Sequence, residues 1–325
     1  MEELKDFRNF LYLCWKQLNL PDPTPVQYDI ADYVQNGPKR RVIQAFRGVG
    51  KSWITSAYVC HQLLMDPSKN ILVVSASKQR SDDFSTFTLR LIHEMSILEH
   101  LKPREDQRNS KVAFDVGPAP ASHAPSVVSK GITSQITGSR ADLIIADDVE
   151  SLNNSATQMM RDKLLETIKE FDAVLKPDGE ILYLGTPQTE MTIYSALSER
   201  GYKTRIWPAR IPSESQQNRM GSTLAPLVKA LTEDSGTPVD PQRFNNEDLM
   251  EREASYGRTG FALQFMLDAT LSDQNRYPLK LSDLLVMSIN GDEGPEKVVW
   301  APDRDRVVED LPCVGLSGDR YYTPF

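Results

Sequence analysis

Short apolar runs separated by longer segments with helical spacing form the main pattern along this chain. Apolar residues dominate four runs, 41–44, 70–77, 143–146 and 180–184, without alternating with polar residues. Such runs are typical of strands that are buried on both faces of a parallel sheet. Helices are predicted over 3–18, 26–35, 53–59 and 78–98, and from Asn154 or Ser155 to about residue 175. The alternation of strand and helix predicts an α/β fold with a mostly parallel sheet flanked by helices.

The pattern changes after Pro208. Residues 211–245 are polar and rich in Ser, Gln, Asn and Pro, which predicts an irregular segment. Residues 246–267 regain helical spacing and predict a small helical lid beside the sheet. We therefore expect the main α/β domain to cover 1–210, a lid subdomain to cover 211–300, and a linker to cover 301–325.

A glycine-rich segment follows the first predicted strand and opens a helix. Its residues are Ala45, Phe46, Arg47, Gly48, Val49, Gly50, Lys51 and Ser52. Strand, glycine-rich loop, Gly-Lys-Ser and helix make up the phosphate-binding P-loop, in which the glycines let successive N–H groups face one anion. Lys51 is expected to reach the β- and γ-phosphates, and the Ser52 hydroxyl to ligate Mg²⁺. Ala45 stands where the strict pattern has its first glycine.

An acidic cluster ends the strand predicted over 143–146. Asp147, Asp148 and Glu150 place three carboxylates within four residues. Asp147 stands where a Walker B carboxylate ligates Mg²⁺ through water, and a second carboxylate is needed to orient the attacking water. Both Asp148 and Glu150 are candidates for that second role, and Asp148 is preferred. Three such charges would repel each other unless a bound cation relieved the repulsion.

Further polar residues are candidates for nucleotide contacts. Gln27 precedes the P-loop by about two dozen residues, and its amide offers a donor and an acceptor that match the adenine edge. The alternative for Gln27 is a solvated residue at a helix start. Thr186, or alternatively Gln188, follows the strand predicted over 180–184 and is a candidate to sense a γ-phosphate. The alternative for Thr186 is an ordinary turn, which Gly-Thr-Pro would also form.

Composition narrows the functional class. The net charge of −8 argues against a broad nucleic-acid-coating surface, although it leaves room for a small basic site. Cys14, Cys60 and Cys313 show no pairing or metal-binding spacing, which favours a reducing, cytosolic setting. No run of about 18 apolar residues predicts a membrane span. The Asn-Lys-x-Asp guanine reader of GTPases is missing from the sequence.

The motifs together resemble the large terminase subunit of short-tailed bacteriophages. The resemblance covers nearly the whole chain, and its strings are Leu20 to Gln27, Gln44 to Ser52, Val73 to Lys78, Phe114 to Pro118, Thr137 to Glu150, Leu184 to Glu190 and Tyr256 to Leu267. It implies an ATPase of the additional-strand, catalytic-carboxylate class of P-loop NTPases. It also implies that ATP hydrolysis drives double-stranded DNA into a procapsid.

The resemblance further implies partners and residue roles. The expected partners are double-stranded DNA, the portal protein of the procapsid, the small terminase subunit, and further copies of this chain in a pentameric ring. We expect the isolated chain to be a monomer. Its location would be the host cytoplasm, with transient docking at the portal vertex. Thr186, Pro187 and Gln188 resemble the coupling motif of the family, Gln27 its adenine-contacting glutamine, and Arg47 and Arg140 its candidate arginine fingers.

Two rival functions and one expected absence complete the sequence-based hypotheses. An ATP-dependent helicase or other nucleic-acid remodeller shares the same motifs, but it needs a second similar lobe. A nucleotide-binding assembly module that does not hydrolyse ATP is the rival from another class. Full terminase subunits also carry a C-terminal nuclease domain of the ribonuclease H type. We expect no nuclease activity from this chain, because residues 301–325 read as the linker toward that domain.

Overall fold

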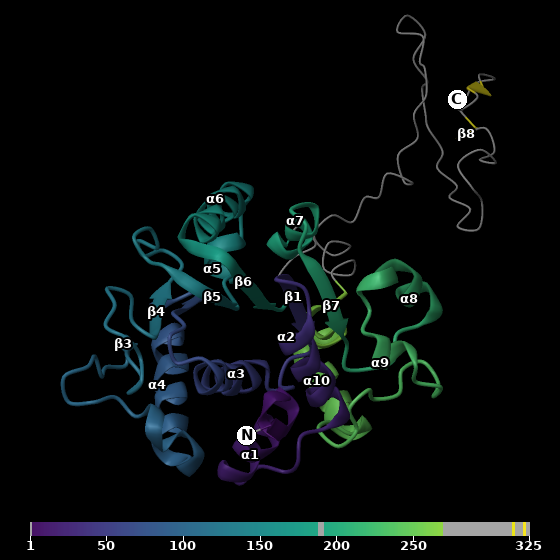
Figure 1. The fold of residues 1–325 in the computed structure, drawn as a ribbon. Coiled ribbons are helices and arrows are strands. Elements are labelled where there is room, and N and C mark those ends of the chain that lie inside the picture. Colours follow the sequence, from purple (N-terminus) through teal and green to yellow (C-terminus); the bar gives the residue numbers. More distant parts are fainter. Residues whose placement is uncertain (1, 188–191, 269–313, 316–320, 323–325) are drawn as a thin grey trace, which may run out of the picture. The chain divides into compact units, whose positions relative to one another are not determined.

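The computed structural model describes residues 2–187, 192–268, 314, 315, 321 and 322 (Figure 1). The strands are β1 (Arg40–Ala45), β2 (Ile71–Ser75), β3 (Ala113–Phe114), β4 (Val127–Gly131), β5 (Ala141–Asp147), β6 (Leu175–Gly185), β7 (Lys203–Trp207), β8 (Val314–Gly315) and β9 (Tyr321–Tyr322). The α-helices are α1 (Phe7–Gln17), α2 (Pro25–Asn36), α3 (Lys51–Met65), α4 (Lys78–Glu94), α5 (Leu152–Ser155), α6 (Gln158–Val174), α7 (Ile193–Glu199), α8 (Glu214–Met220), α9 (Pro226–Lys229) and α10 (Asn246–Phe261). Short helical turns are η1 (Glu2–Lys5), η2 (Ser96–Leu101), η3 (Gly221–Thr223) and η4 (Ala262–Met266).

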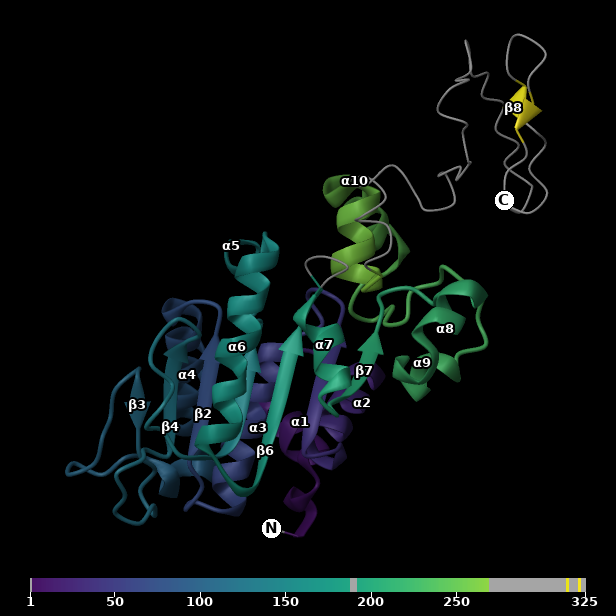
Figure 2. The same cartoon turned by 90° about the horizontal axis from the view of Figure 1, so that it is seen from above.

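Seven strands form one sheet in the order β3-β4-β2-β5-β6-β1-β7. All neighbouring pairs in it are parallel except β3 with β4. Figure 2 shows β6 and β7 running in the same direction. Strand β6 lies between β1, which leads into the P-loop, and β5, which ends at Asp147. This inserted strand defines the additional-strand class of P-loop fold that the sequence predicted.

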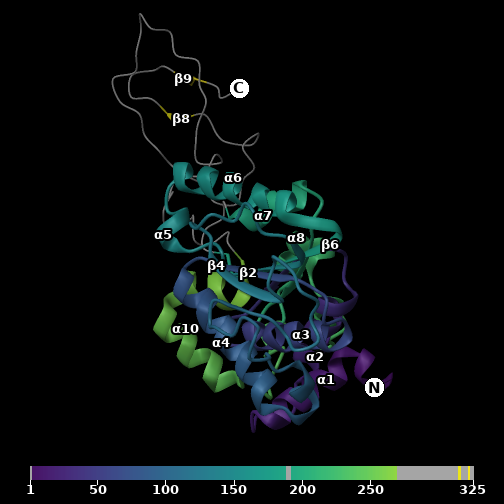
Figure 3. The ribbon, with the colours of Figure 1, turned by 60° about the vertical axis from the view of Figure 1, so that its left-hand side comes forward.

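Two apolar cores lie on opposite faces of the sheet because successive strand residues point to opposite sides. Ile43 and Ile145 join one core, whereas their neighbours Val42 and Ile144 join the other. Helices α1 to α4 supply the first core, and α6 and α7 supply the second. Figure 3 shows α6 and α7 on one side of the sheet and α1 to α4 on the other. The sheet is thus buried on both faces, as its continuous apolar runs predicted.

Side-chain caps set several helix boundaries differently from the prediction. The helix predicted over 3–18 begins at Phe7, because the Asp6 carboxylate accepts from the Arg8 amide. The helix predicted from Asn154 or Ser155 is two helices: these residues belong to α5, and Thr157 caps α6. The helix predicted to residue 98 ends at Glu94 and is followed by η2.

Other differences concern strands and the irregular segment. Strand β6 begins at Leu175, earlier than predicted, and includes Asp178 in a left-handed conformation with φ of 65°. Strands β3, β4 and β7 of the sheet were not predicted. Strand β7 starts with three polar residues and is buried only at Ile206 and Trp207. The segment 211–245 contains the short helices α8 and α9, so it is not irregular throughout. The helical prediction for 246–267 is confirmed by α10 and η4.

Packing divides the chain into two units, Met1–Ser272 and Asp273–Phe325. The first contains the seven-stranded sheet, and the second contains β8 paired antiparallel with β9. Apart from these two strands, the predicted linker 301–325 lies outside the described residues, as does the lid prediction beyond residue 268. Among the residues that the structure describes, no helix is long and apolar enough to cross a membrane.

Candidate functional site

The P-loop curls around the end of β1 and leads directly into α3. Gly48 and Gly50 have φ angles of 92° and 95°, a left-handed region that residues with a side chain rarely adopt. Gly50 is also the N-cap of α3, so the loop ends at a helix N-terminus, where N–H groups and the helix dipole favour an anion. The loop therefore has the backbone form that a phosphate cradle requires.

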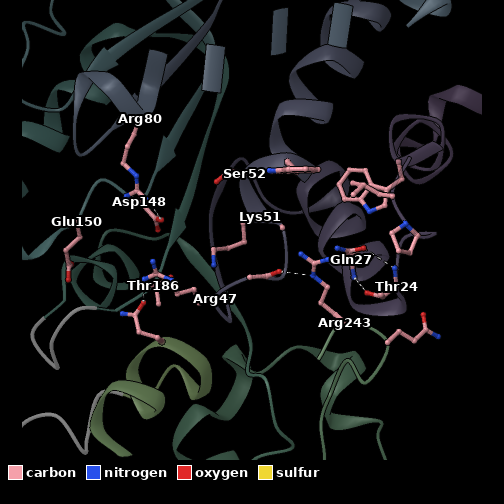
Figure 4. Close-up of a pocket in the computed structure, with 18 of the residues that line it drawn as sticks. Thr24, Gln27, Arg47, Lys51, Ser52, Arg80, Asp148, Glu150, Thr186 and Arg243 are labelled. Atoms are coloured by element: carbon pink, nitrogen blue, oxygen red, sulfur yellow. Dashed lines mark hydrogen bonds and ion pairs between the residues drawn. The ribbon is translucent and has the colours of Figure 1, made fainter. Parts of the chain in front are cut away.

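Lys51 lies inside the curl of this loop. Its Nζ donates to the carbonyl oxygens of Ala45 at 2.5 Å and Phe46 at 3.5 Å. Loss of hydration lowers the pKa of Lys51, and the carboxylates of Asp148 and Asp147 act in the opposite direction. The ammonium thus contacts the backbone of the loop, and two nearby carboxylates favour its charged form. Figure 4 shows Lys51 with one of them, Asp148.

Ser52 and Asp147 meet at the junction of α3 and β5. The Ser52 hydroxyl lies 3.2 Å from each carboxylate oxygen of Asp147. Burial, followed by the neighbouring Asp148, raises the pKa of Asp147 to about 7. A hydroxyl and a carboxylate are oxygen donors of the kind that Mg²⁺ prefers, so this pair fits the ion that the sequence predicted.

Asp148 faces Arg80, which comes from the first turn of α4. The Arg80 guanidinium lies 3.5 Å from Oδ2 of Asp148 (Figure 4). Asp148 has φ of 47°, and its backbone N–H donates to the carbonyl of Leu184 on β6. This left-handed residue turns the chain sharply, so the Asp148 side chain departs from the direction of Asp147.

Glu150 takes a third direction. Its Oε2 accepts from the Thr192 hydroxyl at 2.6 Å and from the Ile193 amide at 2.8 Å, and the residue is only 2% exposed. The three carboxylates therefore contact different protein groups, although Asp148 still adds to burial in raising the pKa of Asp147, as the expected repulsion requires. These groups are protein donors on α3, α4 and the start of α7.

Thr186 comes directly after β6 and is 6% exposed. The residue before it must be glycine, because a Cβ on Gly185 would lie 1.9 Å from Cζ of Tyr194. Thr186 lines the same cavity as Lys51. Pro187 is described, whereas Gln188 of the predicted coupling motif lies outside the described residues.

The structure gives Gln27 contacts within the protein. Its Nε2 donates to the Val49 carbonyl at 2.8 Å, and its Oε1 accepts from the Thr24 amide at 3.1 Å. With Thr24 it forms a capping box at the start of α2, and it is 4% exposed. The alternative of a solvated Gln27 is excluded by this burial. Its contact with adenine stays a prediction.

The two candidate arginine fingers lie at opposite ends of the parallel strands, since Arg47 follows the end of β1 and Arg140 precedes the start of β5. Arg47 lines the cavity, and its guanidinium donates to Oε1 of Gln264 at 3.3 Å. Arg140 is exposed, immediately precedes β5, and donates to its neighbour Ser139. Because Asp147 ends the same strand, Arg140 stands at the far edge from the acidic cluster, as the sequence predicted.

One cavity of about 770 Å³ lies at the C-terminal edge of the sheet, and the candidate residues that line it are Gln27, Arg47, Gly48, Gly50, Lys51, Ser52, Asp148, Glu150 and Thr186. Sequence analysis missed several lining residues that come from distant segments, among them Trp15, Trp53, Arg80, Gln242, Arg243 and Gln264. Arg80 could have been found, because it begins the helix after β2, whose end lies at this edge. No sequence signal marks Gln242, Arg243 or Gln264.

The inserted strand, the P-loop and the acidic strand end define the chain as a P-loop NTPase fold of the additional-strand class. Comparison of sequences confirms the resemblance to a large terminase subunit. Over 324 residues the chain is 50% identical to the large terminase subunit of Enterobacteria phage T3. The match covers 97% of this chain and 55% of that protein, so the chain spans about half the length of its relative.

Solved structures and family models were also compared. The ATPase domain of a large terminase from a Thermus phage is similar at a TM-score of 0.47 and 16% identity, covering 79% of this chain and 97% of that one. The large terminase of bacteriophage HK97 is similar at a TM-score of 0.46 and 13% identity, covering 75% and 50%. No family model matches the chain.

Proposed function

We propose that this chain is the ATP-hydrolysing motor domain of a phage large terminase subunit, which translocates double-stranded DNA into a procapsid. The observation that carries the proposal is the meeting of Ser52 and Asp147 at 3.2 Å beside the P-loop. Phosphoryl transfer requires backbone N–H groups that hold the phosphates, a lysine ammonium and oxygen ligands for Mg²⁺. The P-loop, Lys51, and the pair Ser52 and Asp147 supply these parts. The identity of 50% with the phage T3 protein supports the packaging role.

Different residues of the cavity bind different parts of the substrate in this proposal. The N–H groups of the P-loop hold the phosphates, and Lys51 leaves the carbonyls of Ala45 and Phe46 to contact the β- and γ-phosphates. Ser52 and Asp147 hold Mg²⁺, which neutralises charge on the phosphate oxygens when it is bound. Gln27 contacts adenine in this proposal. It does so through the second N–H of its side-chain amide and the second lone pair of its oxygen, which its bonds to Thr24 and Val49 leave unused.

Asp148 is the proposed group that orients the attacking water. It lines the cavity, and Arg80 holds one of its oxygens. Glu150 is the weaker candidate, because its carboxylate already accepts two hydrogen bonds at the start of α7. Thr186 senses the γ-phosphate from the end of β6, next to both acidic residues. Catalysis of this kind consists mainly of positioning and electrostatic stabilisation.

The arginines act from different subunits in this proposal. Arg47 works in cis or senses the nucleotide, and Arg140 reaches the site of a neighbouring copy in a ring, for which we propose a pentamer. The isolated chain is a monomer in this scheme. The assembled ring works in the host cytoplasm at the portal of the procapsid, together with the small terminase subunit.

Loss of Lys51 or Asp147 tests the proposed function. Lys51→Ala and Asp147→Asn should each lower kcat for ATP at least about 10²-fold, because each removes an electrostatic group from the transition state. Lys169→Ala, which removes an exposed lysine on α6, is the control. Steady-state release of phosphate is the measurement. Hydrolysis by Lys51→Ala at the parental rate would refute the assignment.

Mixed subunits test the arginine in trans. An arginine finger contributes about 10³–10⁵ in rate, so a lone subunit should turn over slowly and its specific activity should rise with concentration. Lys51→Ala subunits retain Arg140 and should restore part of the activity of Arg140→Ala subunits. Activity that is independent of concentration, with no restoration in the mixture, would exclude Arg140 as the donor.

A further inference from the structure

Three residues that lie far apart in the sequence form hydrogen bonds with the outer side of the P-loop, one through its backbone carbonyl and two through their side chains. The Arg47 amide donates to the Gln264 carbonyl at 2.9 Å. The Gly48 carbonyl accepts from Nε of Arg243 at 3.0 Å, and the Val49 carbonyl accepts from Gln27 at 2.8 Å. Figure 4 shows Arg243 and Gln27 together on this side of the loop. Three successive P-loop residues are thus fixed through their backbone.

Fixing a carbonyl also fixes the next amide. A trans peptide unit is planar, and its C=O and N–H groups point in opposite directions. Because Gln27 holds the Val49 carbonyl outward, the Gly50 N–H must point to the inner side of the curl. Arg243 restrains the preceding peptide plane, whose N–H group belongs to Val49 and donates to the Phe46 carbonyl at 3.4 Å. The direction of the Gly50 N–H, which would meet a phosphate, therefore depends on Gln27, and Arg243 fixes the loop one residue earlier.

A buried carboxylate supports Gln27 from the same segment as Arg243. The Oδ2 of Asp240 accepts from the Thr24 hydroxyl at 2.7 Å, and the Thr24 amide donates to Gln27. Asp240, Thr24 and Gln27 are each at most 5% exposed. A continuous chain of hydrogen bonds thus runs from Asp240 through Thr24 and Gln27 to the Val49 carbonyl.

Phe244 closes the same face by contact. A Cβ on Gly48 would lie 2.7 Å from Cζ of Phe244, so the two already touch closely. The Phe244 ring also meets Phe46 edge-on, with the centroids 5.9 Å apart. Residues 240–244 therefore reach the loop through a carboxylate, a guanidinium and an aromatic ring.

We infer that residues 240–244 position the P-loop for the triphosphate, with Arg243 and Asp240 as positioning residues that act through Gly48 and through Gln27. The inference rests on the proposed binding of ATP by this loop. Arg243 also lines the cavity, so a direct contact with the base or ribose is the competing role. The two roles differ in which part of the nucleotide they affect.

Calorimetric titration with Mg²⁺–ATP and with Mg²⁺–tripolyphosphate separates the two roles. Arg243→Ala removes an exposed side chain and a charge-assisted hydrogen bond, so both ligands should bind about tenfold more weakly. Arg90→Ala, which removes an exposed arginine on α4, should bind both ligands as the parent chain does. Weaker ATP binding with unchanged tripolyphosphate binding would overturn positioning and assign Arg243 to the base or ribose.

Two substitutions of Asp240 test the buried chain of hydrogen bonds that runs through Thr24 and Gln27 to the Val49 carbonyl. Asp240→Asn keeps an oxygen that can accept from Thr24, whereas Asp240→Leu keeps similar bulk without an acceptor. We expect Asp240→Leu to weaken tripolyphosphate binding and Asp240→Asn to restore most of it, with unfolding temperatures measured in parallel. Parental affinity in both Arg243→Ala and Asp240→Leu would overturn the inference while leaving the proposed function intact. Failure of the parent chain to bind either ligand would overturn both.

Discussion

The P-loop and the acidic turn 147–150 lie at the same edge of the sheet but are built by different means. The P-loop is shaped through its backbone, by two left-handed glycines and by donors to its carbonyls from Gln27 and Arg243. The acidic turn is shaped through its side chains, each of which has its own partner. Substitutions should therefore act through conformation in the first region and through charge in the second.

The acidic turn shows how similar carboxylates that are close in sequence acquire separate contacts. Ser52 contacts Asp147, Arg80 contacts Asp148, and Thr192 contacts Glu150. The left-handed backbone of Asp148 makes this separation possible, at a cost of about 1–3 kcal/mol for a non-glycine residue. Asp is among the residues that tolerate this conformation best. The strain thus accompanies a division of contacts that spacing alone would not reveal.

The largest effect that tests this division is expected from Asp148→Asn. The substitution keeps the shape of the side chain but removes the charge that we propose orients water, so kcat should fall at least about 10²-fold. ATP affinity should change little, because Lys51 and the P-loop are intact. Single-turnover hydrolysis and equilibrium ATP binding provide the two measurements.

Glu150→Gln is the matched comparison for kinetics. Its carboxylate is 2% exposed and bonded at the start of α7, so turnover should fall much less than in Asp148→Asn. Loss of hydrolysis in Glu150→Gln together with parental turnover in Asp148→Asn would reverse the two roles. The contacts of Glu150 with Thr192 and Ile193 would then have to break before hydrolysis.

The second prediction concerns the backbone of the P-loop. Gly48→Ala adds a methyl group at φ of 92° and places it 2.7 Å from the Phe244 ring. ATP binding should weaken about tenfold or more, since both the strain and the displaced ring alter the cradle. Gly201→Ala imposes similar strain at φ of 86° with nothing within 4 Å, so it should affect stability alone. Equal ATP affinities in the two variants would show that Phe244 leaves the loop unaffected.

Sequence predicted the parts of the fold that depend on local pattern. The buried strands, the P-loop, the acidic end of β5 and the helical segment after residue 245 follow from apolar runs, glycine spacing and periodicity. The inserted position of β6 was reached through the class of protein and agrees with the strand order. Strand β7 was missed because its first half is polar and it lies at the edge of the sheet, next to β1.

The site was predictable only where its residues are close in sequence. Asp147, Asp148 and Glu150 are adjacent along the chain, yet their three directions depend on Arg80 and Thr192 from other elements. Arg243 and Asp240 come from a polar segment whose composition indicates only irregular structure. Arg243 contacts Gly48 across 195 residues and Asp240 contacts Thr24 across 216, so both contacts are set by tertiary packing that no local pattern encodes.

The smallest expected effect concerns the structural role of Glu150. Glu150→Gln weakens two buried hydrogen bonds and should lower the free energy of unfolding by about 1–2 kcal/mol. Thr192→Val removes the hydroxyl that contacts Glu150 and caps α7, and should cost about 1 kcal/mol. Denaturant unfolding of both single variants and the double variant measures their coupling.

The coupling decides whether the pair acts as a unit. If Thr192 and Glu150 stabilise the protein through their mutual bond, the double variant should lose less than the sum of the single losses, by about 0.5–1 kcal/mol. Thr167→Val, whose hydroxyl contacts the Lys163 carbonyl within α6, should add independently to Glu150→Gln. Additive losses for Thr192 and Glu150 would contradict a structural role for their contact, and would return Glu150 to the candidates for catalysis.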